Sequence, residues 1–201
     1  AGPNRMNRAV VIKAAAGLSR FLAEELPEGF TVVIGYDGRH GSKQFALDTA
    51  AVVEAAGGRA LLFDRETPTP VVAFALRHLG ADAAVMVTAS HNPASDNGYK
   101  VYLGGRVVAG PGQGAQIVPP YDARILSCIE SVPSATEVPR AEGGWETIGD
   151  EVLDAYVERV KQIVPRPRAD LNIALTVMHG VGGDLATRVL EECGFSNVSV
   201  V

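Results

Sequence analysis

Hydrophobic residues follow two different patterns over the first 87 positions of the chain. In three short runs nearly every residue is apolar or β-branched, namely at 30–35, 59–63 and 83–87. Such runs are typical of strands that are buried on both faces of a parallel sheet. Elsewhere apolar residues recur at helical spacing, which predicts amphipathic helices over residues 11–22, 42–56 and 69–79. Ser42 is the predicted cap of the second helix, and Pro70 stands in the first turn of the third.

The predicted order of helices and strands makes a parallel sheet with right-handed crossovers. Loops that follow parallel strands emerge at one edge of the sheet, where open α/β sheets bind their ligands. Two such loops carry polar residues, GYDGRHG at 35–41 and TASHNP at 88–93. We therefore expect Asp37, Arg39 and His40 to be neighbours of Ser90.

The pattern changes after the third strand. Residues 99–109 read as a hairpin with a two-residue turn at Gly104-Gly105, and residues 110–120 form a glycine- and proline-rich loop before a helix over 121–130. The segment 131–149 is rich in Pro, Gly, Ser and Glu and is the best domain boundary.

A second unit begins after this boundary. Its pattern predicts a helix over 152–163, a buried strand over 172–180, a helix from Leu185 to Cys193 and a final strand. Two strands and a helix cannot bury their own faces, so we expect a truncated unit. The predicted fold is a three-layer α/β/α domain with a mainly parallel mixed sheet over 1–140, followed by a linker helix and the start of a similar domain over 141–201.

Composition excludes several classes of protein. The 201 residues are 47% hydrophobic and carry a net charge of −5, as in an ordinary globular protein. The acidic balance argues against nucleic acid as the main partner, and no apolar run approaches the ~18 residues that a membrane span needs. The two cysteines, Cys128 and Cys193, are expected to be buried, reduced thiols in a cytoplasmic protein.

The loop TASHNP has two local interpretations. It is either a polar turn in which Ser90 and Asn92 bind the backbone, or a loop that presents Ser90 as a nucleophile. A serine hydrolase is disfavoured because the Gly-x-Ser-x-Gly elbow is absent. Cations expected around this edge suit an anionic ligand such as phosphate; they are Arg39, His40, Lys43, His91, Lys100 and Arg106. The alternative role for Arg39 is an ion pair with Asp37. The alternative for Lys100 is a solvated side chain on a strand, without a part in binding.

TASHNP and the following DNGYK at 96–100 resemble the phosphoserine loop of the α-D-phosphohexomutases, the phosphoglucomutase and phosphomannomutase superfamily. GYDGR at 35–39, PTP at 68–70 and HGVGG at 179–183 agree with the same family. The resemblance covers essentially the whole chain and corresponds to the first domain and the opening of the second in a four-domain enzyme.

This resemblance implies a mechanism. Ser90 carries a phosphoryl group, gives it to a hexose phosphate and receives another from the resulting hexose 1,6-bisphosphate, so that hexose 1-phosphate and 6-phosphate interconvert. Lys100 matches the general acid/base, and His91 matches a hydrogen-bond donor beside the phosphoserine. Thr88 and Asn92 shape the loop, and with Arg39 and His40 they are the candidate phosphate-binding residues. Mg²⁺ is the implied cofactor, with the phosphorylated Ser90 as its ligand in this chain.

Three motifs of the family are not found in the 201 residues. They are the Asp-Gly-Asp-x-Asp-Arg loop that supplies the other magnesium ligands, the Gly-Glu-x-Ser-type sugar loop and the C-terminal Arg-Thr-Ser-Gly-Thr phosphate loop. We therefore expect this chain by itself to be inactive. Phosphomannomutase or phosphoglucomutase activity is the main hypothesis. The alternatives are a phosphopentomutase, a phosphoglucosamine-type mutase and a non-catalytic phosphate-binding module.

Overall fold

The computed structural model describes residues 5–164 and 170–201. They divide into two compact units, residues 1–148 and 149–201. The boundary at residue 148 lies within the segment 131–149 that the sequence indicates, and it falls later than residue 140, the predicted end of the first domain. The reason is that Glu146–Ile148 forms a strand of the first sheet, pairing in parallel with Arg59–Phe63.

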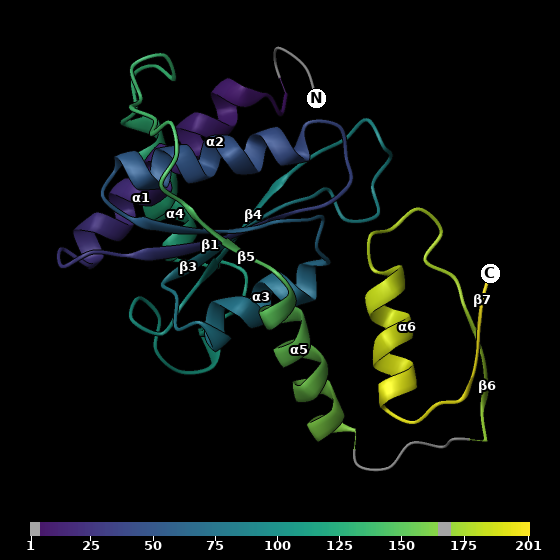
Figure 1. Ribbon diagram of the computed structural model, residues 1–201. Coiled ribbons are helices and arrows are strands. Elements are labelled where there is room, and N and C mark those ends of the chain that lie inside the picture. The colour runs from purple at the N-terminus through teal and green to yellow at the C-terminus, as the bar shows by residue number, and fades with distance from the viewer. Residues whose placement is uncertain (1–4, 165–169) are drawn as a thin grey trace. The chain divides into compact units, whose positions relative to one another are not determined.

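The first unit alternates helices and strands (Figure 1). Its helices are α1 (Arg8–Glu25), α2 (Ser42–Ala55), α3 (Thr69–His78) and α4 (Tyr121–Glu130), with a short 3₁₀ helix at Gly110–Gly112. Its strands are β1 (Thr31–Tyr36), β2 (Arg59–Phe63), β3 (Ala83–Val87), β4 (Tyr99–Leu103) and β5 (Glu146–Ile148). Except for β5, each strand and each α-helix lies where the sequence predicts one.

The five strands form one mixed sheet in the order β4-β3-β1-β2-β5. β1 pairs in parallel with both β2 and β3, as predicted, and β4 alone runs antiparallel, beside β3. The three central strands are almost wholly buried, which explains their unbroken apolar sequences. β1 and β3 pair in register from Val32 with Ala83 to Tyr36 with Val87, so the two strands end side by side.

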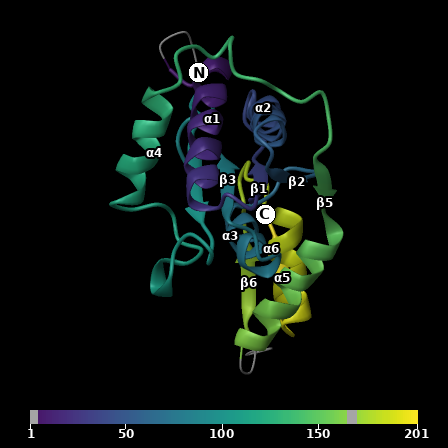
Figure 2. The same ribbon diagram turned by 90° about the vertical axis from the view of Figure 1, so that its left-hand side faces the viewer.

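Helices cover both faces of this sheet and confirm the α/β/α class. α1 lies between α2 and α4 on one face, and α3 packs on the other (Figure 2). Side chains of α1, α2 and α4 share one core with the strands, including Phe21, Phe45 and Ile125. A Cβ at Gly17 would lie 2.3 Å from the Ile129 side chain, so α1 and α4 approach too closely there for any larger residue.

The predicted hairpin over residues 99–109 is wrong. β4 forms, but the chain then turns, because Val107 and Val108 both donate their N–H groups to the Gly104 carbonyl. Arg106 explains the departure, since its guanidinium makes two hydrogen bonds, of 2.6 and 2.7 Å, to the buried carboxylate of Asp82. Pairing with a buried charge outweighs continuing an exposed strand.

The second unit contains α5 (Asp150–Ile163), β6 (Asn172–Leu175), α6 (Gly183–Glu192) and β7 (Asn197–Val200). β6 and β7 pair in parallel. The predicted strand over 172–180 ends early, because the chain turns at Met178, whose φ is 52°, and Gly180 N donates to Val177 O at 2.7 Å. β6 alternates between exposed and half-buried residues and is not the buried strand that was expected.

The prediction that both cysteines are buried is right for one of them. Cys128 and Cys193 are both free thiols, but only Cys193 is buried and Cys128 is half-buried.

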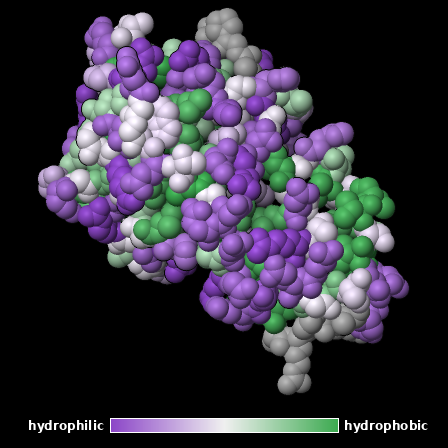
Figure 3. All heavy atoms as spheres, viewed as in Figure 1, coloured by the Kyte–Doolittle hydropathy of each residue, from purple (hydrophilic) through white to green (hydrophobic). Residues whose placement is uncertain are grey.

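Among the described residues, none of the helices has the length and apolar character required to traverse a bilayer. Hydrophilic residues occupy much of the face seen in Figure 3, between smaller hydrophobic patches.

Candidate active site at the carboxyl edge of the sheet

The loops after β1 and β3 meet at the carboxyl edge of the sheet, as the topology predicts. Asp37 follows β1 and donates its N–H to the Val87 carbonyl at 3.1 Å. Thr88 follows β3, and its N–H bonds the Gly98 carbonyl at 3.1 Å. These backbone bonds continue the pairing of β1 with β3 and of β3 with β4 one residue past the strands. The side chains of Asp37 and Arg39 then join the GYDGRHG loop to the TASHNP loop.

The Asp37 carboxylate accepts hydrogen bonds from residues of both loops. Its Oδ1 accepts hydrogen bonds from the Ser42 hydroxyl at 2.9 Å and from the Arg39 N–H at 3.3 Å. Its Oδ2 accepts from the Thr88 hydroxyl at 2.7 Å and from Arg39 Nε at 3.0 Å. Four donors fill the acceptor sites of the carboxylate, whose side chain is only 13% exposed.

Arg39 uses all five of its guanidinium N–H donors inside the protein. Nε binds Asp37, and the two terminal nitrogens bind four backbone carbonyls. Nη1 donates to Pro93 O at 2.8 Å and Asp96 O at 3.1 Å, and Nη2 donates to Ser90 O at 2.6 Å and Asn92 O at 2.9 Å. The ion pair with Asp37, one of the two roles considered for Arg39, is therefore present, and the same side chain holds the whole loop.

Ser90 has a left-handed backbone with φ 58°, a conformation that is uncommon outside glycine. Its N–H donates to Thr88 Oγ1 at 2.9 Å, while Thr88 itself is buried. The Ser90 side chain is exposed, and its Oγ lies 3.4 Å from His91 Nδ1. The loop thus uses its backbone for internal bonds and leaves the serine hydroxyl and the imidazole facing outward.

The other predicted binding residues lie in or beside the same loop. Asn92 is exposed and its N–H bonds Ala89 O at 3.0 Å, which makes the turn at Ser90. His40 is also exposed, and its carbonyl accepts from the Asn97 side chain at 3.3 Å. These placements bring both residues to the carboxyl edge.

Two residues of this edge were missed or misjudged from sequence. Asn97 Nδ2 donates to Ser42 Oγ at 2.9 Å and its Oδ1 accepts the Gly98 N–H at 2.9 Å, so it links the two loops. An Asn-Gly pair in a sequence indicates a turn and does not reveal such contacts. Ser42 is not the cap of α2, because Gly41, with φ 81°, occupies that position. The Ser42 hydroxyl instead donates a hydrogen bond to Asp37, a contact that the local sequence around Ser42 does not reveal.

Lys100 and Arg106 lie in different places. Lys100 is the second residue of β4 and pairs with Met86, close to the carboxyl edge. Its side chain is half-buried and has no ion pair within the described part of the chain. Arg106 does not join the cations of this edge as expected. It binds Asp82, just before β3, and the Gly29 carbonyl, before β1, which places it at the amino edge.

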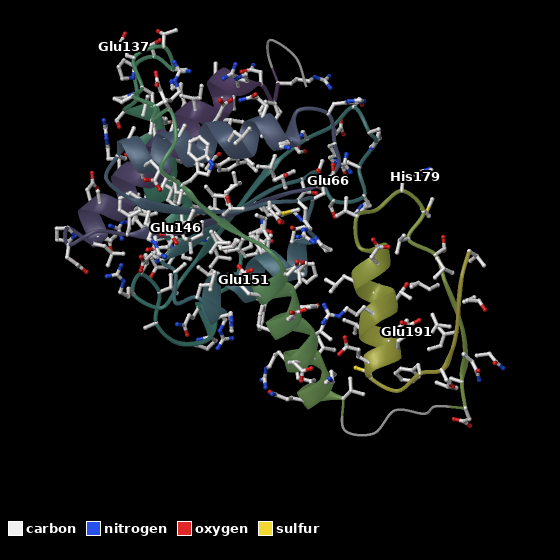
Figure 4. All side chains as sticks on the ribbon, in the orientation of Figure 1. Glu66, Glu137, Glu146, Glu151, His179 and Glu191 are labelled. Atoms are coloured by element: carbon white, nitrogen blue, oxygen red, sulfur yellow. The ribbon has the colours of Figure 1, made fainter. Side chains whose placement is uncertain are left out.

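A phenol also lies at the carboxyl edge. The Tyr36 hydroxyl is 3.5 Å from the Asp64 carbonyl, at the ends of β1 and β2. Burial raises the pKa of Tyr36, and the carboxylates of Glu66 and Asp64 raise it further. Glu66 lies on the loop between β2 and α3 (Figure 4). Tyr36 therefore stays protonated at neutral pH beside these carboxylates.

The residues described hold no group of three or more His, Cys, Asp or Glu side chains that could bind a metal ion. Asp37 is connected to Ser90 through the Thr88 hydroxyl, but its carboxylate already accepts hydrogen bonds from Arg39, Ser42 and Thr88 and has no oxygen left for a metal ion. Ser90 is exposed, and a phosphoryl group on its Oγ would offer the hard oxygen ligands that suit Mg²⁺. The fit of magnesium to this chain is therefore limited to the Ser90 position.

Fold and loop together define a class: an α/β/α domain that presents a serine hydroxyl from an internally hydrogen-bonded loop at the carboxyl edge of a mixed sheet. Residues 1–134 match the family model described as phosphoglucomutase/phosphomannomutase, alpha/beta/alpha domain I. The chain belongs to the phosphoglucomutase/phosphomannomutase family.

Individual relatives agree with this assignment. The chain is 42% identical, over 98% of its length, to a probable phosphomannomutase of Haemophilus influenzae, of which it covers 39%. It is 34% identical, over 96% of its length, to a phosphoribomutase of Saccharomyces cerevisiae, of which it covers 33%. A crystal structure of a putative phosphomannomutase from Thermus thermophilus superposes with a TM-score of 0.79 at 26% identity, over 98% of this chain and 42% of that one. The chain thus spans less than half the length of each.

His179 and the glycines of the HGVGG segment belong to the second unit. His179 lies on the loop between β6 and α6 (Figure 4), and Gly182 and Gly183 begin that helix. A Cβ on Gly183 would lie 3.1 Å from the Val177 side chain. The tight turn from strand to helix therefore accounts for a glycine at this position.

Proposed function

We propose that the complete protein is a phosphohexomutase in which Ser90 carries the phosphoryl group. The observation that supports this best is that the TASHNP loop is held by its backbone and by Thr88, and not by the Ser90 hydroxyl. Arg39 donates hydrogen bonds to backbone carbonyls of the loop, and Asp37 accepts one from the Thr88 hydroxyl. The Ser90 hydroxyl remains exposed beside His91. A phosphoryl carrier needs such a fixed yet accessible oxygen, because transfer depends on positioning.

The chemistry follows from these groups. In the first half-reaction, the bond between phosphorus and Ser90 Oγ breaks and a bond from phosphorus to a sugar hydroxyl oxygen forms. The hydroxyl proton passes to Lys100, and the departing Ser90 Oγ takes up a proton from solvent, to which Ser90 is exposed. The hexose 1,6-bisphosphate then turns over, and Ser90 Oγ attacks its other phosphorus atom and returns its own proton to solvent. The returning proton from protonated Lys100 completes the release of the isomeric monophosphate, so atoms and charge balance.

Each residue of the edge has a distinct role in this proposal. His91 donates a hydrogen bond to the phosphoryl oxygens, because its Nδ1 already lies 3.4 Å from Ser90 Oγ. Thr88 and Asn92 shape the loop, and Arg39 holds it from behind. The exposed Lys43 supplies positive charge toward an anionic sugar phosphate, and the exposed His40 supplies a hydrogen-bonding imidazole. Lys100, half-buried on β4 opposite Met86, is the proposed general acid/base.

Magnesium is part of the proposal. The phosphorylated Ser90 is the position in this chain that would hold Mg²⁺, with further ligands from elsewhere in the complete protein. When bound, the ion neutralises charge on the transferring phosphoryl group. The chain itself contributes the phosphoserine oxygen and a backbone that does not need to rearrange.

The substrate is proposed as a class. Mannose or glucose phosphate is the main hypothesis, in line with the relative from Haemophilus influenzae named as a probable phosphomannomutase. A pentose phosphate is the specific alternative, because another relative is named a phosphoribomutase. A reducing compartment such as the cytoplasm is proposed because both cysteines are free thiols.

Mass spectrometry of the natively expressed complete protein tests this function. We expect one phosphate on the peptide that contains Ser90, which disappears when a hexose monophosphate is added without bisphosphate. A Ser90 that is never phosphorylated, together with no interconversion of glucose or mannose phosphates, would contradict the proposal and favour a non-catalytic phosphate-binding module.

A further inference from the structure

A single carboxylate oxygen is connected to both sides of the Ser90 backbone. Asp37 Oδ2 accepts from the Thr88 hydroxyl, and that hydroxyl oxygen accepts the Ser90 N–H at 2.9 Å. The same Oδ2 binds Arg39 Nε, and Arg39 Nη2 donates to the Ser90 carbonyl at 2.6 Å. These four hydrogen bonds close a ring that passes through Asp37, Arg39, Ser90 and Thr88.

We propose that the Arg39–Asp37 ion pair is a positioning unit for phosphoryl transfer, and this inference rests on the proposed function. The ring fixes the peptide groups on both sides of the Ser90 Cα. A left-handed backbone is unfavourable for a residue other than glycine. Without the ring, Ser90 would relax toward ordinary φ values, and its Cβ and Oγ would swing away from their present direction.

The pair acts on the loop and not on the phosphate. Every guanidinium N–H of Arg39 is occupied, and its side chain is only 12% exposed. The Asp37 carboxylate neutralises the Arg39 charge at 3.0 Å, so the pair adds little net attraction for an anion. The scaffold is therefore in place whether or not Ser90 carries a phosphate, which a carrier that is repeatedly charged and discharged requires.

This role predicts a specific kinetic signature. A group that does not touch the substrate leaves ground-state affinity unchanged, so KM should stay constant. A displaced Ser90 Oγ weakens only the transition state, so kcat should fall. Loss of a phosphate-binding contact would have the opposite pattern and would raise KM.

The structure offers a matched control in the Arg106–Asp82 pair. There an arginine also binds an aspartate and a backbone carbonyl: Arg106 donates to the buried Asp82 through Nε and Nη2, to the Gly29 carbonyl through Nη2 and to the exposed Glu28 through Nη1. This second pair lies at the amino edge of the sheet, away from Ser90. A general loss of stability should therefore affect both pairs, whereas positioning of Ser90 depends on Arg39 alone.

The test compares Arg39→Lys with Arg106→Lys in the complete protein, using glucose 1-phosphate and mannose 1-phosphate. Lysine keeps the charge but has three donors and cannot bridge four carbonyls. We expect Arg39→Lys to lower kcat roughly 10- to 100-fold, as for a misplaced catalytic group, with KM within about twofold of wild type. Arg106→Lys should lower the melting temperature and leave both constants unchanged.

Three results would overturn the positioning role. One is an Arg39→Lys enzyme with wild-type kcat, and another is a raised KM with kcat retained. The third is an Arg39→Lys protein that loses activity only in proportion to its unfolded fraction. Because wild type is assayed beside the variants, an inactive wild type without phosphate on Ser90 would refute the proposed function itself and is distinguishable from all three.

Thr88→Val supplies a second variant in case Arg39→Lys does not fold. Valine has nearly the shape of threonine, and it removes only the hydroxyl that joins Asp37 to the Ser90 N–H. We expect the same fall in kcat at constant KM. A folded Thr88→Val enzyme with unchanged kcat would contradict the ring as the source of the Ser90 geometry.

Discussion

The Ser90 carbonyl oxygen lies 2.6 Å from Arg39 Nη2, although 51 residues separate the two in the chain. The contact exists because β1 and β3 are adjacent and parallel, so their following loops leave the sheet together. Each loop is completed by the other. Changes that separate the loops should therefore affect Ser90 even when they lie outside the TASHNP segment.

Gly98 offers a test of this dependence. A Cβ at this position would lie 2.7 Å from the Thr88 carbonyl oxygen, which is backbone and cannot move aside cheaply. We expect Gly98→Ala to lower the free energy of unfolding by roughly 1–3 kcal/mol, measured by urea denaturation. Gly143→Ala is the control, because a Cβ there meets nothing within 4 Å. Equal free energies of unfolding for the two variants would show that the TASHNP loop can move away from the residues before β4 at no cost in stability.

Much of this edge could be predicted from sequence. Unbroken apolar runs gave the three central strands, and the order of elements placed Asp37 and Arg39 beside Ser90. The occupancy of the Arg39 donors could not be predicted, because four of the five acceptors are backbone carbonyls, which no side-chain pattern reveals. The false hairpin has a similar origin, since the Gly104-Gly105 signal was outweighed by Arg106 and the buried Asp82, 24 residues earlier.

Asp82 should matter for stability more than its position in a turn suggests. It is 1% exposed and accepts hydrogen bonds from Thr31 N at 2.8 Å and from Arg106. Asp82→Ala leaves these donors without an acceptor, and we expect a loss of about 1–3 kcal/mol in the free energy of unfolding. Glu146→Ala breaks the exposed ion pair with Arg59 and should change stability little. A smaller loss for Asp82→Ala than for Glu146→Ala would contradict this assignment.

Tyr99 gives a pH dependence whose sign is fixed. Burial raises the pKa of the Tyr99 phenol, and the hydrogen bond with the Thr49 hydroxyl at 3.1 Å partly opposes the shift. Above the ordinary tyrosine pKa of 10.0, the unfolded chain loses this proton while the folded protein keeps it. The free energy of unfolding should therefore fall as pH rises above 10.0, with a slope of up to about 1.4 kcal/mol per pH unit for this group.

Tyr99→Phe removes this contribution. The variant should show a shallower loss of stability at alkaline pH than wild type in urea denaturation measured at several pH values. Tyr156→Phe, a tyrosine of α5 in the second unit, is the comparison. Identical slopes for wild type and Tyr99→Phe would mean that the Tyr99 phenol titrates normally in the folded protein.

Lys100 should affect phosphoryl transfer in both directions, because it is the proposed acceptor of the sugar hydroxyl proton and the proposed donor of that proton when Ser90 is phosphorylated again. We expect Lys100→Met to lower kcat by roughly 10²- to 10⁴-fold, the usual contribution of a general acid/base. The measurement is the rate of hexose 6-phosphate formation from hexose 1-phosphate. A variant with full turnover would remove Lys100 from the mechanism.

The central claim is that Ser90 carries the phosphoryl group that reaches the sugar. Its most direct measurement is a single-turnover experiment in which the complete protein, labelled with ³²P on Ser90, is mixed with unlabelled glucose 1-phosphate or mannose 1-phosphate. The label should leave the protein and appear in the hexose bisphosphate and then in hexose 6-phosphate, while Ser90→Ala takes up no label. Label that stays on the protein while hexose 1-phosphate is converted, or a Ser90→Ala enzyme with wild-type turnover, would contradict the account.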